Sequence, residues 1–226
     1  MRKLVFLKAP PIMKQSDPPR RLIVGITGAT GVIYGIRALQ VLRELGIETH
    51  LVVSRAGEMT REYETQLSRR DLHALADVVY PINDVGAAIA SGSFRTMGML
   101  IAPCSVRSLA EVATGVTTSL LTRAADVVLK ERRTLVMMVR EAPLHAGHLR
   151  NMLTATEMGA IIHPPVPAFY TNPKSIEDIV DQSLGRALDC FGLDMPNMPR
   201  WGEVPNAVEI GDIDDDDDQA DQDSKR

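Results

Sequence analysis

Two kinds of apolar pattern alternate along the chain. Short continuous runs of apolar residues are typical of buried strands, and apolar residues spaced three or four positions apart are typical of amphipathic helices. The runs predict strands over residues 21–27, 47–53, 77–80, 97–102, 134–139 and 159–163. The spaced pattern predicts helices over residues 32–45, 105–114, 120–131, 145–158 and 175–191, and another that begins near residue 55. This alternation predicts an α/β domain whose mostly parallel sheet is covered on both faces.

The two ends of the chain differ from this central region. Residues 1–20 carry five Lys and Arg and one Asp, a net charge of +4, whereas residues 212–226 carry eight Asp, one Lys and one Arg, a net charge of −6. The acidic segment repels itself and has almost nothing to bury, so it is predicted to be disordered. We therefore expect a flexible basic extension over residues 1–20, a single domain over residues 21–203 and a disordered acidic tail over residues 204–226.

Composition narrows the class of protein. The 226 residues have a net charge of only −4, and nothing in them requires a nucleic acid partner. The chain has no apolar run of 18 residues, which is about the length needed to cross a membrane. The four-residue apolar run near the N-terminus is too short for a signal sequence. The two cysteines do not make a disulfide framework. These features predict a soluble cytoplasmic protein.

The residues that follow each strand are the candidates for a site, because parallel α/β sheets bind ligands where their strands end. The first predicted strand leads into the turn Gly28-Ala29-Thr30-Gly31 and then into a helix. A helix N-terminus offers free N–H groups and a partial positive charge, and the Thr30 hydroxyl can add a further hydrogen bond. The turn therefore predicts a phosphate-binding site.

The end of the second strand bears on which compound carries that phosphate. An NAD site needs an acidic residue there, but the chain has Ser54 and Arg55. Arg55 leaves NADP open, since an arginine can bind its extra phosphate. A mononucleotide such as FMN needs only one phosphate cradle and polar contacts to its ribityl chain and ring, so it satisfies the pattern with fewer requirements.

The fourth predicted strand ends at Pro103-Cys104-Ser105. Ser105 and Ser108 have the spacing of a helix N-cap and its N3 residue. Cys104 has two interpretations, a nucleophile whose pKa is lowered by the helix terminus or a small buried thiol. Upstream, the small residues of Ser91-Gly92-Ser93 allow a flat ring to lie close to the backbone.

The most charged segment covers residues 123–133, RAADVVLKERR. On a helix, Arg123, Asp126 and Lys130 form one stripe, which is also typical of a solvated helix face. Together with Arg140, which follows the fifth strand, Arg123 and Lys130 can surround a phosphate. Glu141 is a candidate proton donor or acceptor, because an apolar site raises the pKa of a carboxyl group toward neutrality.

Other polar residues are less informative. His145 and His148 have a spacing that can bind a metal on a helix, but no third ligand is evident, and no metal is expected. Tyr170 and Arg186 can each reach an anion, although each taken alone is typical of a surface or packing residue.

Several segments together resemble the UbiX family of flavin prenyltransferases. They are listed in chain order: TGATG-x-x-YG at 27–35, Ser54, ASGS at 90–93, PCS at 103–105, RAADVxLKERR at 123–133, REAPLH at 140–145, HL-x-NM at 148–152, PAFY at 167–170 and PRWGE at 199–203. The resemblance covers residues 21–203. RAADVxLKERR followed by REAP is highly specific, whereas the glycine turn alone is weak.

The resemblance implies a Rossmann-like, flavodoxin-like fold and a homododecamer built from trimers. It implies a metal-independent enzyme that joins the dimethylallyl group of dimethylallyl monophosphate to N5 and C6 of reduced FMN. The product, prenylated FMN, passes to a UbiD-type decarboxylase. The C-terminal part of the pocket comes from a neighbouring subunit in this family.

The resemblance also assigns roles by matching position. The residues that line FMN are Gly28, Ala29, Thr30, Ser54, Ser105, Val106, Arg107, Ser108, Arg123 and Arg140. The residues that hold the prenyl phosphate are Lys130, Arg140, Tyr170 and Arg186, with Trp201 near the pocket. Glu141 assists proton transfer, and the catalytic group also includes Lys130, Glu64 and Thr30.

Two departures and two alternatives accompany this interpretation. Thr30 stands where the family usually has Ser, and Val85 stands where some members place an aromatic residue. One alternative is a flavin-dependent cysteine-type decarboxylase, although its catalytic His and its PxMNxxMW-like motif are not evident. The other is a non-catalytic FMN-binding accessory subunit of an aromatic-acid decarboxylase, which the intact set of charged residues argues against.

Overall fold

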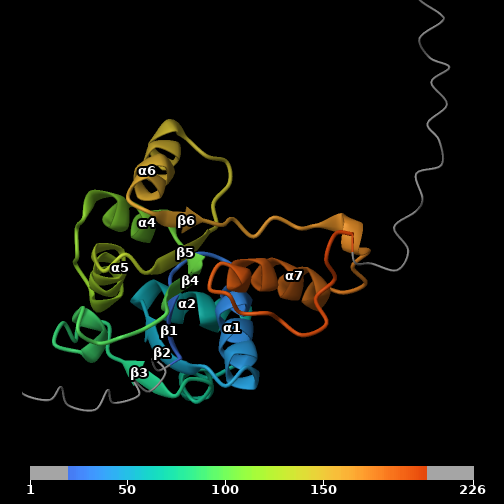
Figure 1. Cartoon of the computed structure of the whole chain (residues 1–226), viewed down its shortest axis with the longest axis horizontal. Helices are drawn as coiled ribbons and strands as arrows, with labels where there is room; N and C mark the ends of the chain where they lie inside the picture. The colour runs from blue at the N-terminus through green and yellow to red at the C-terminus, as the bar shows by residue number, and fades with distance from the viewer. Residues whose placement is uncertain (1–19, 203–226) are drawn as a thin grey trace, which may run out of the picture.

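The structure, a computed structural model, describes residues 20–202. The predicted basic extension over residues 1–20, apart from Arg20, and the predicted acidic tail over residues 204–226 lie outside this range. Each of the six predicted strands is present, as β1 (Arg21–Ile26), β2 (Glu48–Val53), β3 (Val78–Tyr80), β4 (Gly98–Cys104), β5 (Thr134–Val139) and β6 (Ala160–Ile162). Figure 1 shows them as one sheet, from β6 at the top to β3 at the bottom.

All strand pairs in this sheet are parallel, in the order β3-β2-β1-β4-β5-β6. This is the standard Rossmann order, in which the chain reverses direction across the sheet between β1 and β4. It differs from the 2-1-3-4-5 order of flavodoxin itself, but the predicted Rossmann-like α/β class is confirmed. The ligand site of such a sheet lies beyond the carboxyl ends of the strands near β1 and β4.

The predicted helices are also present, with the following bounds: α1 (Val32–Glu44), α2 (Arg55–Glu64), α4 (Val106–Thr114), α5 (Leu120–Lys130), α6 (Ala146–Glu157) and α7 (Ile176–Asp189). Three short elements were not predicted, namely α3 (Arg69–His73) and two 3-10 turns, Ala88–Ala90 and Phe169–Thr171. The sequence does carry a signal for α3, because Ser68 and Asp71 form a capping box at its start.

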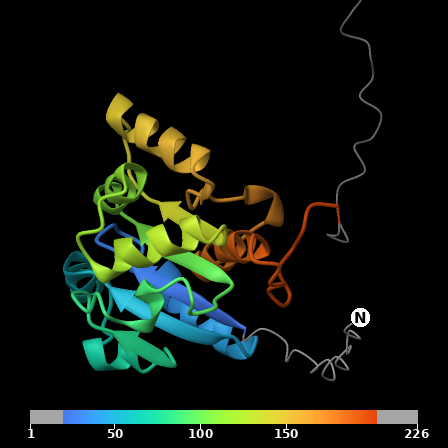
Figure 2. The same ribbon diagram turned by 60° about the vertical axis from the view of Figure 1, so that its left-hand side comes forward.

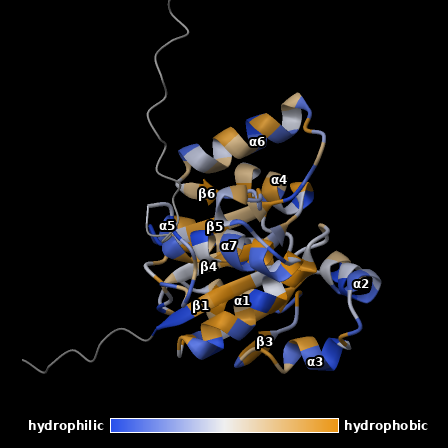
Figure 3. Cartoon of the chain, turned by 90° about the vertical axis from the view of Figure 1, so that its right-hand side faces the viewer, coloured by the Kyte–Doolittle hydropathy of each residue, from blue (hydrophilic) through white to orange (hydrophobic). Residues whose placement is uncertain are grey.

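Alternate residues of the strands face two separate cores. Leu22, Val24 and Ile26 of β1 pack with α1, α3 and α7, whereas Ile23 packs on the opposite face with α4, α5 and α6. Strands covered on both faces explain the continuous apolar runs in the sequence. Figure 1 shows α1 and α7 on one side of the sheet and α4 and α5 on the other, and Figure 3 shows the apolar strands between these layers.

Two segments extend away from this layered body. Helix α6 has only one buried residue, Ala155, and the chain from His163 to Ser175 leaves β6 as an extended arm before it returns as α7. Figure 2 shows α6 and this arm projecting from the sheet. Several large apolar side chains of these segments are exposed, including Leu153, Val166 and Phe169, and so is Ile176 at the start of α7.

Candidate active site

The carboxyl edge of the sheet brings four predicted segments together. They are Gly28–Thr30 after β1, Ser54 after β2, Ser105 after β4, and Arg140 with Glu141 after β5. Two adjoining clefts of about 390 Å³ and 320 Å³ lie at this edge and share Gly28, Ala56, Ser105 and Arg107 as lining residues. We call these two clefts together the flavin cleft, after the flavin that the resemblance implies.

Three helices point their N-termini at the larger cleft. Its lining includes Ser54 at the start of α2, Ser105 at the start of α4 and Ser119 at the start of α5. Each serine side chain caps its helix, accepting a hydrogen bond from Gly57 N, Ser108 N and Thr122 N respectively, at 3.0, 3.3 and 3.3 Å. The predicted capping pair of Ser105 and Ser108 is thus confirmed. Three helix N-termini give this cleft a concentration of partial positive charge that suits an anion.

Thr27 ties two of these strand ends together. Its buried hydroxyl donates to Pro103 O at 2.8 Å and accepts from Ser105 N at 2.7 Å. The turn after β1 also lies close to α2, since a Cβ on Gly28 would lie 2.2 Å from the Cβ of Ala56. Sequence reasoning did not single out Thr27, Ser119 or Thr122, although Ser119 and Thr122 form a capping box that the sequence displays.

The N-terminus of α1 already holds a carboxylate. Glu64, the last residue of α2, accepts hydrogen bonds from Gly31 N and Val32 N at 2.9 Å, and the Thr30 hydroxyl donates to the same carboxylate. Thr30 and Glu64, both named as site residues by the resemblance, therefore lie side by side. The glycine turn does not offer these two N–H groups to a phosphate, whereas the residues at the starts of α2, α4 and α5 line the larger cleft.

Arg140 and Glu141 line the smaller cleft together with Ala29, Thr30 and Val106. Arg140 N donates to Cys104 O at 3.1 Å, which places this residue directly beside the end of β4. The Arg140 side chain makes no ion pair within residues 20–202. Its positive charge and the Glu141 carboxylate therefore face the same small cleft.

Cys104 is a packing residue. The side chain is completely buried in the core beneath α4, and this burial raises the pKa of its thiol well above the ordinary value. Of the two interpretations of Cys104, the structure supports the small buried thiol and not the nucleophile.

Arg123 and Lys130 lie at opposite ends of α5. Arg123 sits in the first turn and pairs with Asp126 at 2.6 Å, as the predicted stripe requires. Lys130 pairs with Glu131 at the other end, where a Cβ on Gly92 would meet both side chains. The six residues of β5 then span about 20 Å from the Lys130 end to Arg140. Within one chain, Arg123, Lys130 and Arg140 therefore do not surround a single phosphate.

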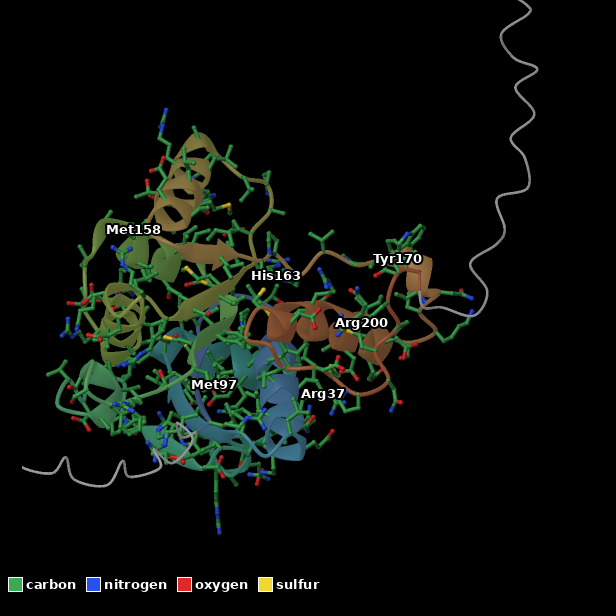
Figure 4. The ribbon with its side chains drawn as sticks, in the orientation of Figure 1. Arg37, Met97, Met158, His163, Tyr170 and Arg200 are labelled. Carbon is green, nitrogen blue, oxygen red and sulfur yellow. The ribbon has the colours of Figure 1, made fainter. Side chains whose placement is uncertain are left out.

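Tyr170, Arg186 and Trp201 belong to a third group of residues, which we call the C-terminal cluster. Tyr170 packs edge-on against Trp201 with ring centroids 5.1 Å apart, and the neighbouring Arg200 makes two hydrogen bonds to Asp189. The same Asp189 carboxylate accepts from Arg186 at 2.7 Å. Figure 4 labels Tyr170 and Arg200 beside α7, with Tyr170 at the end of the arm that lies farther from His163.

His145 and His148 lie together at the start of α6. His145 caps α6 by accepting from Gly147 N at 3.0 Å, and its ring stacks on that of His148 with centroids 3.6 Å apart. Within residues 20–202, no group of three or more His, Cys, Asp and Glu side chains is arranged to hold a metal ion. In the same part of the chain, no helix is long and apolar enough to cross a membrane.

Comparison with known proteins agrees with this geometry. A family model described as Flavoprotein matches residues 11–188, so the chain belongs to the flavoprotein family. The flavin prenyltransferase UbiX of Neisseria meningitidis is 57% identical over 182 residues, which cover 80% of this chain and 96% of that protein. Within the family, the chain is a flavin prenyltransferase of the UbiX type.

Two crystal structures share its fold at high identity. AnUbiX (PadA1) in complex with FMN and dimethylallyl pyrophosphate has a TM-score of 0.80 and 53% identity, covering 80% of this chain and 97% of that one. A dodecameric FMN-dependent UbiX-like decarboxylase from Escherichia coli O157:H7 has a TM-score of 0.78 and 50% identity, covering 80% and 98%. The predicted family, fold class and enzyme class are thereby confirmed.

Proposed function

We propose that this flavin prenyltransferase joins the dimethylallyl group of dimethylallyl monophosphate to N5 and C6 of reduced FMN. The single observation that carries this proposal is the flavin cleft, where three helix N-termini line the larger cleft and Arg140 and Glu141 line the smaller one beside it. The AnUbiX neighbour, which is complexed with FMN and a dimethylallyl phosphate compound, supports both ligands.

The residues of the cleft fit FMN. The N-termini of α2, α4 and α5 supply the donors for its phosphate, through Ser54, the segment 105–108 and the first turn of α5 with Arg123. Gly28, Ala29 and Val106 offer a surface of small side chains beside which a flat ring can lie. Reduced FMN, when bound, supplies the nucleophilic N5 and C6 atoms.

Departure of a phosphate requires neutralisation of the charge that develops on its oxygens. We assign this role to Lys130, Arg140 and Arg186, with the Tyr170 hydroxyl as a further donor, and place Trp201 beside them. These cations supply what a metal ion supplies in other enzymes. Because the single chain separates them, the complete site must be shared between copies of the chain.

Because the cations that hold the phosphate are separated within one chain, we propose that the chain assembles into a homo-oligomer, in the form of a dodecamer. The solved UbiX-like neighbour from Escherichia coli O157:H7 is dodecameric. The arm of this chain exposes Val166 and Phe169 by 70% and 74%, and the first residue of α7, Ile176, is exposed by 74%; large apolar patches of this kind are typical of protein interfaces. Contact between the arm of one copy and the flavin cleft of another would bring Tyr170 and Arg186 to Arg140.

Proton transfer falls to two carboxylates of the flavin cleft. Glu141 is placed to receive or return a proton as the phosphate leaves and the ring regains aromaticity. Glu64 and Thr30, already joined by a hydrogen bond, form a second route for a proton beside the ring. The product, prenylated FMN, would then be consumed by a UbiD-type decarboxylase, and we place the protein in the cytoplasm.

Anaerobic incubation of the full chain with reduced FMN and dimethylallyl monophosphate tests the proposal. Mass spectrometry of the released flavin should show FMN heavier by one C5 unit. A parallel reaction with dimethylallyl pyrophosphate separates the two donors, and we expect faster product formation from the monophosphate. Unmodified FMN in both reactions would refute the proposed function.

A further inference from the structure

One carboxylate holds the two arginines of the C-terminal cluster. Asp189 accepts from Arg186 at 2.7 Å on one side and from both terminal nitrogens of Arg200, at 3.0 and 2.9 Å, on the other. Its side chain is 22% exposed, while that of Arg186 is 55% exposed. The carboxylate is therefore mostly covered, and the guanidinium that it holds remains accessible.

The same carboxylate fixes the aromatic part of the cluster. Arg200 is adjacent in the chain to Trp201, whose ring packs against Tyr170. Arg200 holds the pKa of Asp189 below its ordinary value, with a further contribution from Arg186, so Asp189 is ionised at neutral pH. A bidentate pair between arginine and carboxylate restricts both distance and orientation. Through Arg200, Asp189 thus ties residues 194–201 to the end of α7.

We propose that Asp189 is a positioning residue of the prenyl-phosphate site, which fixes the Arg186 guanidinium and, through Arg200, the Trp201 and Tyr170 rings. This proposal rests on the proposed function of Arg186 and Tyr170 as phosphate ligands. Asp189 does not contact the phosphate. It restricts the Arg186 and Arg200 side chains and residues 194–201 before the phosphate binds. Less conformational entropy is therefore lost on binding.

The direction in which phosphate affinity changes when the Asp189 charge is removed distinguishes a positioning role from electrostatic repulsion. A carboxylate close to a phosphate site repels the incoming anion, so its replacement by a neutral amide would improve phosphate binding if charge alone mattered. Positioning predicts the opposite result. The substitution Asp189→Asn keeps the shape of the side chain and therefore compares the two explanations directly.

The test measures steady-state prenylation by the full-length assembled protein with saturating reduced FMN. For Asp189→Asn we expect an apparent KM for dimethylallyl monophosphate at least tenfold higher, a kcat within threefold of the wild type and unchanged FMN affinity. Asp181→Asn is the matched control, because Asp181 also lies on α7 and makes a bidentate pair, with Arg37, outside the cluster. It should change KM by less than twofold. An unchanged or lower KM in Asp189→Asn would overturn the proposal.

A second readout does not depend on turnover. Trp201 is the only tryptophan in the chain, so its fluorescence reports on the C-terminal cluster. Inorganic phosphate should change this emission in the wild type, and Asp189→Asn should need at least tenfold more phosphate. Arg200→Lys keeps the charge but loses the bidentate fork, and should need severalfold more phosphate.

Equal phosphate dependence in the wild type and both variants, or no response in the wild type, would overturn the positioning role even if prenylation occurs. A wild type that makes no prenylated flavin but shows the expected fluorescence differences would refute only the proposed function.

Discussion

The flavin cleft and the C-terminal cluster are built in different ways. The cleft is lined by short side chains at the ends of β1, β2 and β4 and at the start of α5, together with longer charged side chains such as Arg107 and Arg140. The cluster is made from long side chains of α7, the arm and residues 194–201, held to one another by ion pairs and one aromatic contact. The residues that line a site of the first kind lie together in one chain, whereas a group of the second kind can be carried to another copy.

Loss of the carboxylate chemistry in the flavin cleft should have the largest effect. Glu141→Gln retains the size and the cleft position of the side chain but removes its ability to accept a proton. General acid–base catalysis contributes about 10²–10⁴-fold, so we expect turnover to fall by roughly that factor. FMN affinity, measured by fluorescence quenching, should stay within about threefold. Full activity in this variant would remove Glu141 from the mechanism.

A change in the backbone of the flavin cleft should act on FMN itself. In Gly28→Ala the added methyl group would lie 2.2 Å from the Cβ of Ala56 and 3.1 Å from its backbone carbon, so the start of α2 must move away from β1. We expect FMN affinity to fall on the order of 100-fold, because a phosphate held by helix N-termini depends on their relative placement.

Gly86→Ala is the control for this substitution, since a Cβ at Gly86 would contact only the Asp84 side chain, at an ordinary 3.6 Å. It should leave FMN affinity unchanged. Normal FMN binding by Gly28→Ala would show that the close packing of this turn on α2 does not shape the flavin site.

A substitution in the C-terminal cluster should weaken binding of the prenyl donor and leave FMN affinity unchanged. Arg186→Gln removes a guanidinium that is 55% exposed and paired only with Asp189 among the described residues. A hydrogen bond to a charged group contributes about 1.5–3 kcal/mol, which corresponds to roughly a 10- to 100-fold rise in KM for the prenyl donor. FMN affinity should not change. If Arg186→Gln weakened FMN and the prenyl donor equally, the two regions would not be separate binding sites.

The sequence predicts the flavin cleft better than the cluster for a physical reason. Buried parallel strands give strong apolar runs, and their ends necessarily meet at one edge, so Gly28, Ser54, Ser105 and Arg140 were assigned to one site from position alone. The glycine turn was less well predicted. Its spacing indicates a phosphate cradle, but the Glu64 carboxylate, 33 residues away from Gly31, takes its N–H groups.

The arrangement of the cluster could not be predicted from pattern. Trp201 is assigned only through the resemblance to a family. Tyr170 and Arg186 are noted from the sequence only as residues that can each reach an anion, and Asp189 and Arg200 are not singled out. Ion pairs between residues 11 positions apart, such as Asp189 and Arg200, depend on how the segment after α7 folds back, and no periodicity encodes that. The stripe of Arg123 and Lys130 was predicted correctly as helix geometry, yet α5 carries the two cations to opposite edges of the sheet.

The smallest expected effect is on the pH dependence of stability, through His163 at the start of the arm. Burial lowers the pKa of His163 below its ordinary value, Arg186 lowers it further, and Asp189 opposes the shift. His163 is therefore neutral in the folded protein, and unfolding raises its pKa toward about 6.5. The unfolded state then binds more protons below that pH, so the free energy of unfolding decreases as pH falls from about 6.5 toward the lower folded pKa.

His163→Leu should remove this contribution without the loss of a hydrogen bond at Nδ1, which is buried and has no partner among the described residues. Melting temperatures at about pH 7.5 and 5.5 measure the difference, with Trp201 emission as the signal from the C-terminal cluster. We expect the decrease in melting temperature on acidification to be smaller in the variant than in the wild type, because the variant lacks this protonation. His50, whose pKa is also lowered by burial, remains in both proteins and accounts for a shared decrease. If the melting temperatures of the two proteins changed equally with pH, protonation of His163 would not contribute to the acid sensitivity of the fold. Arg186 and Asp189 would then remain as the charges that hold the cluster.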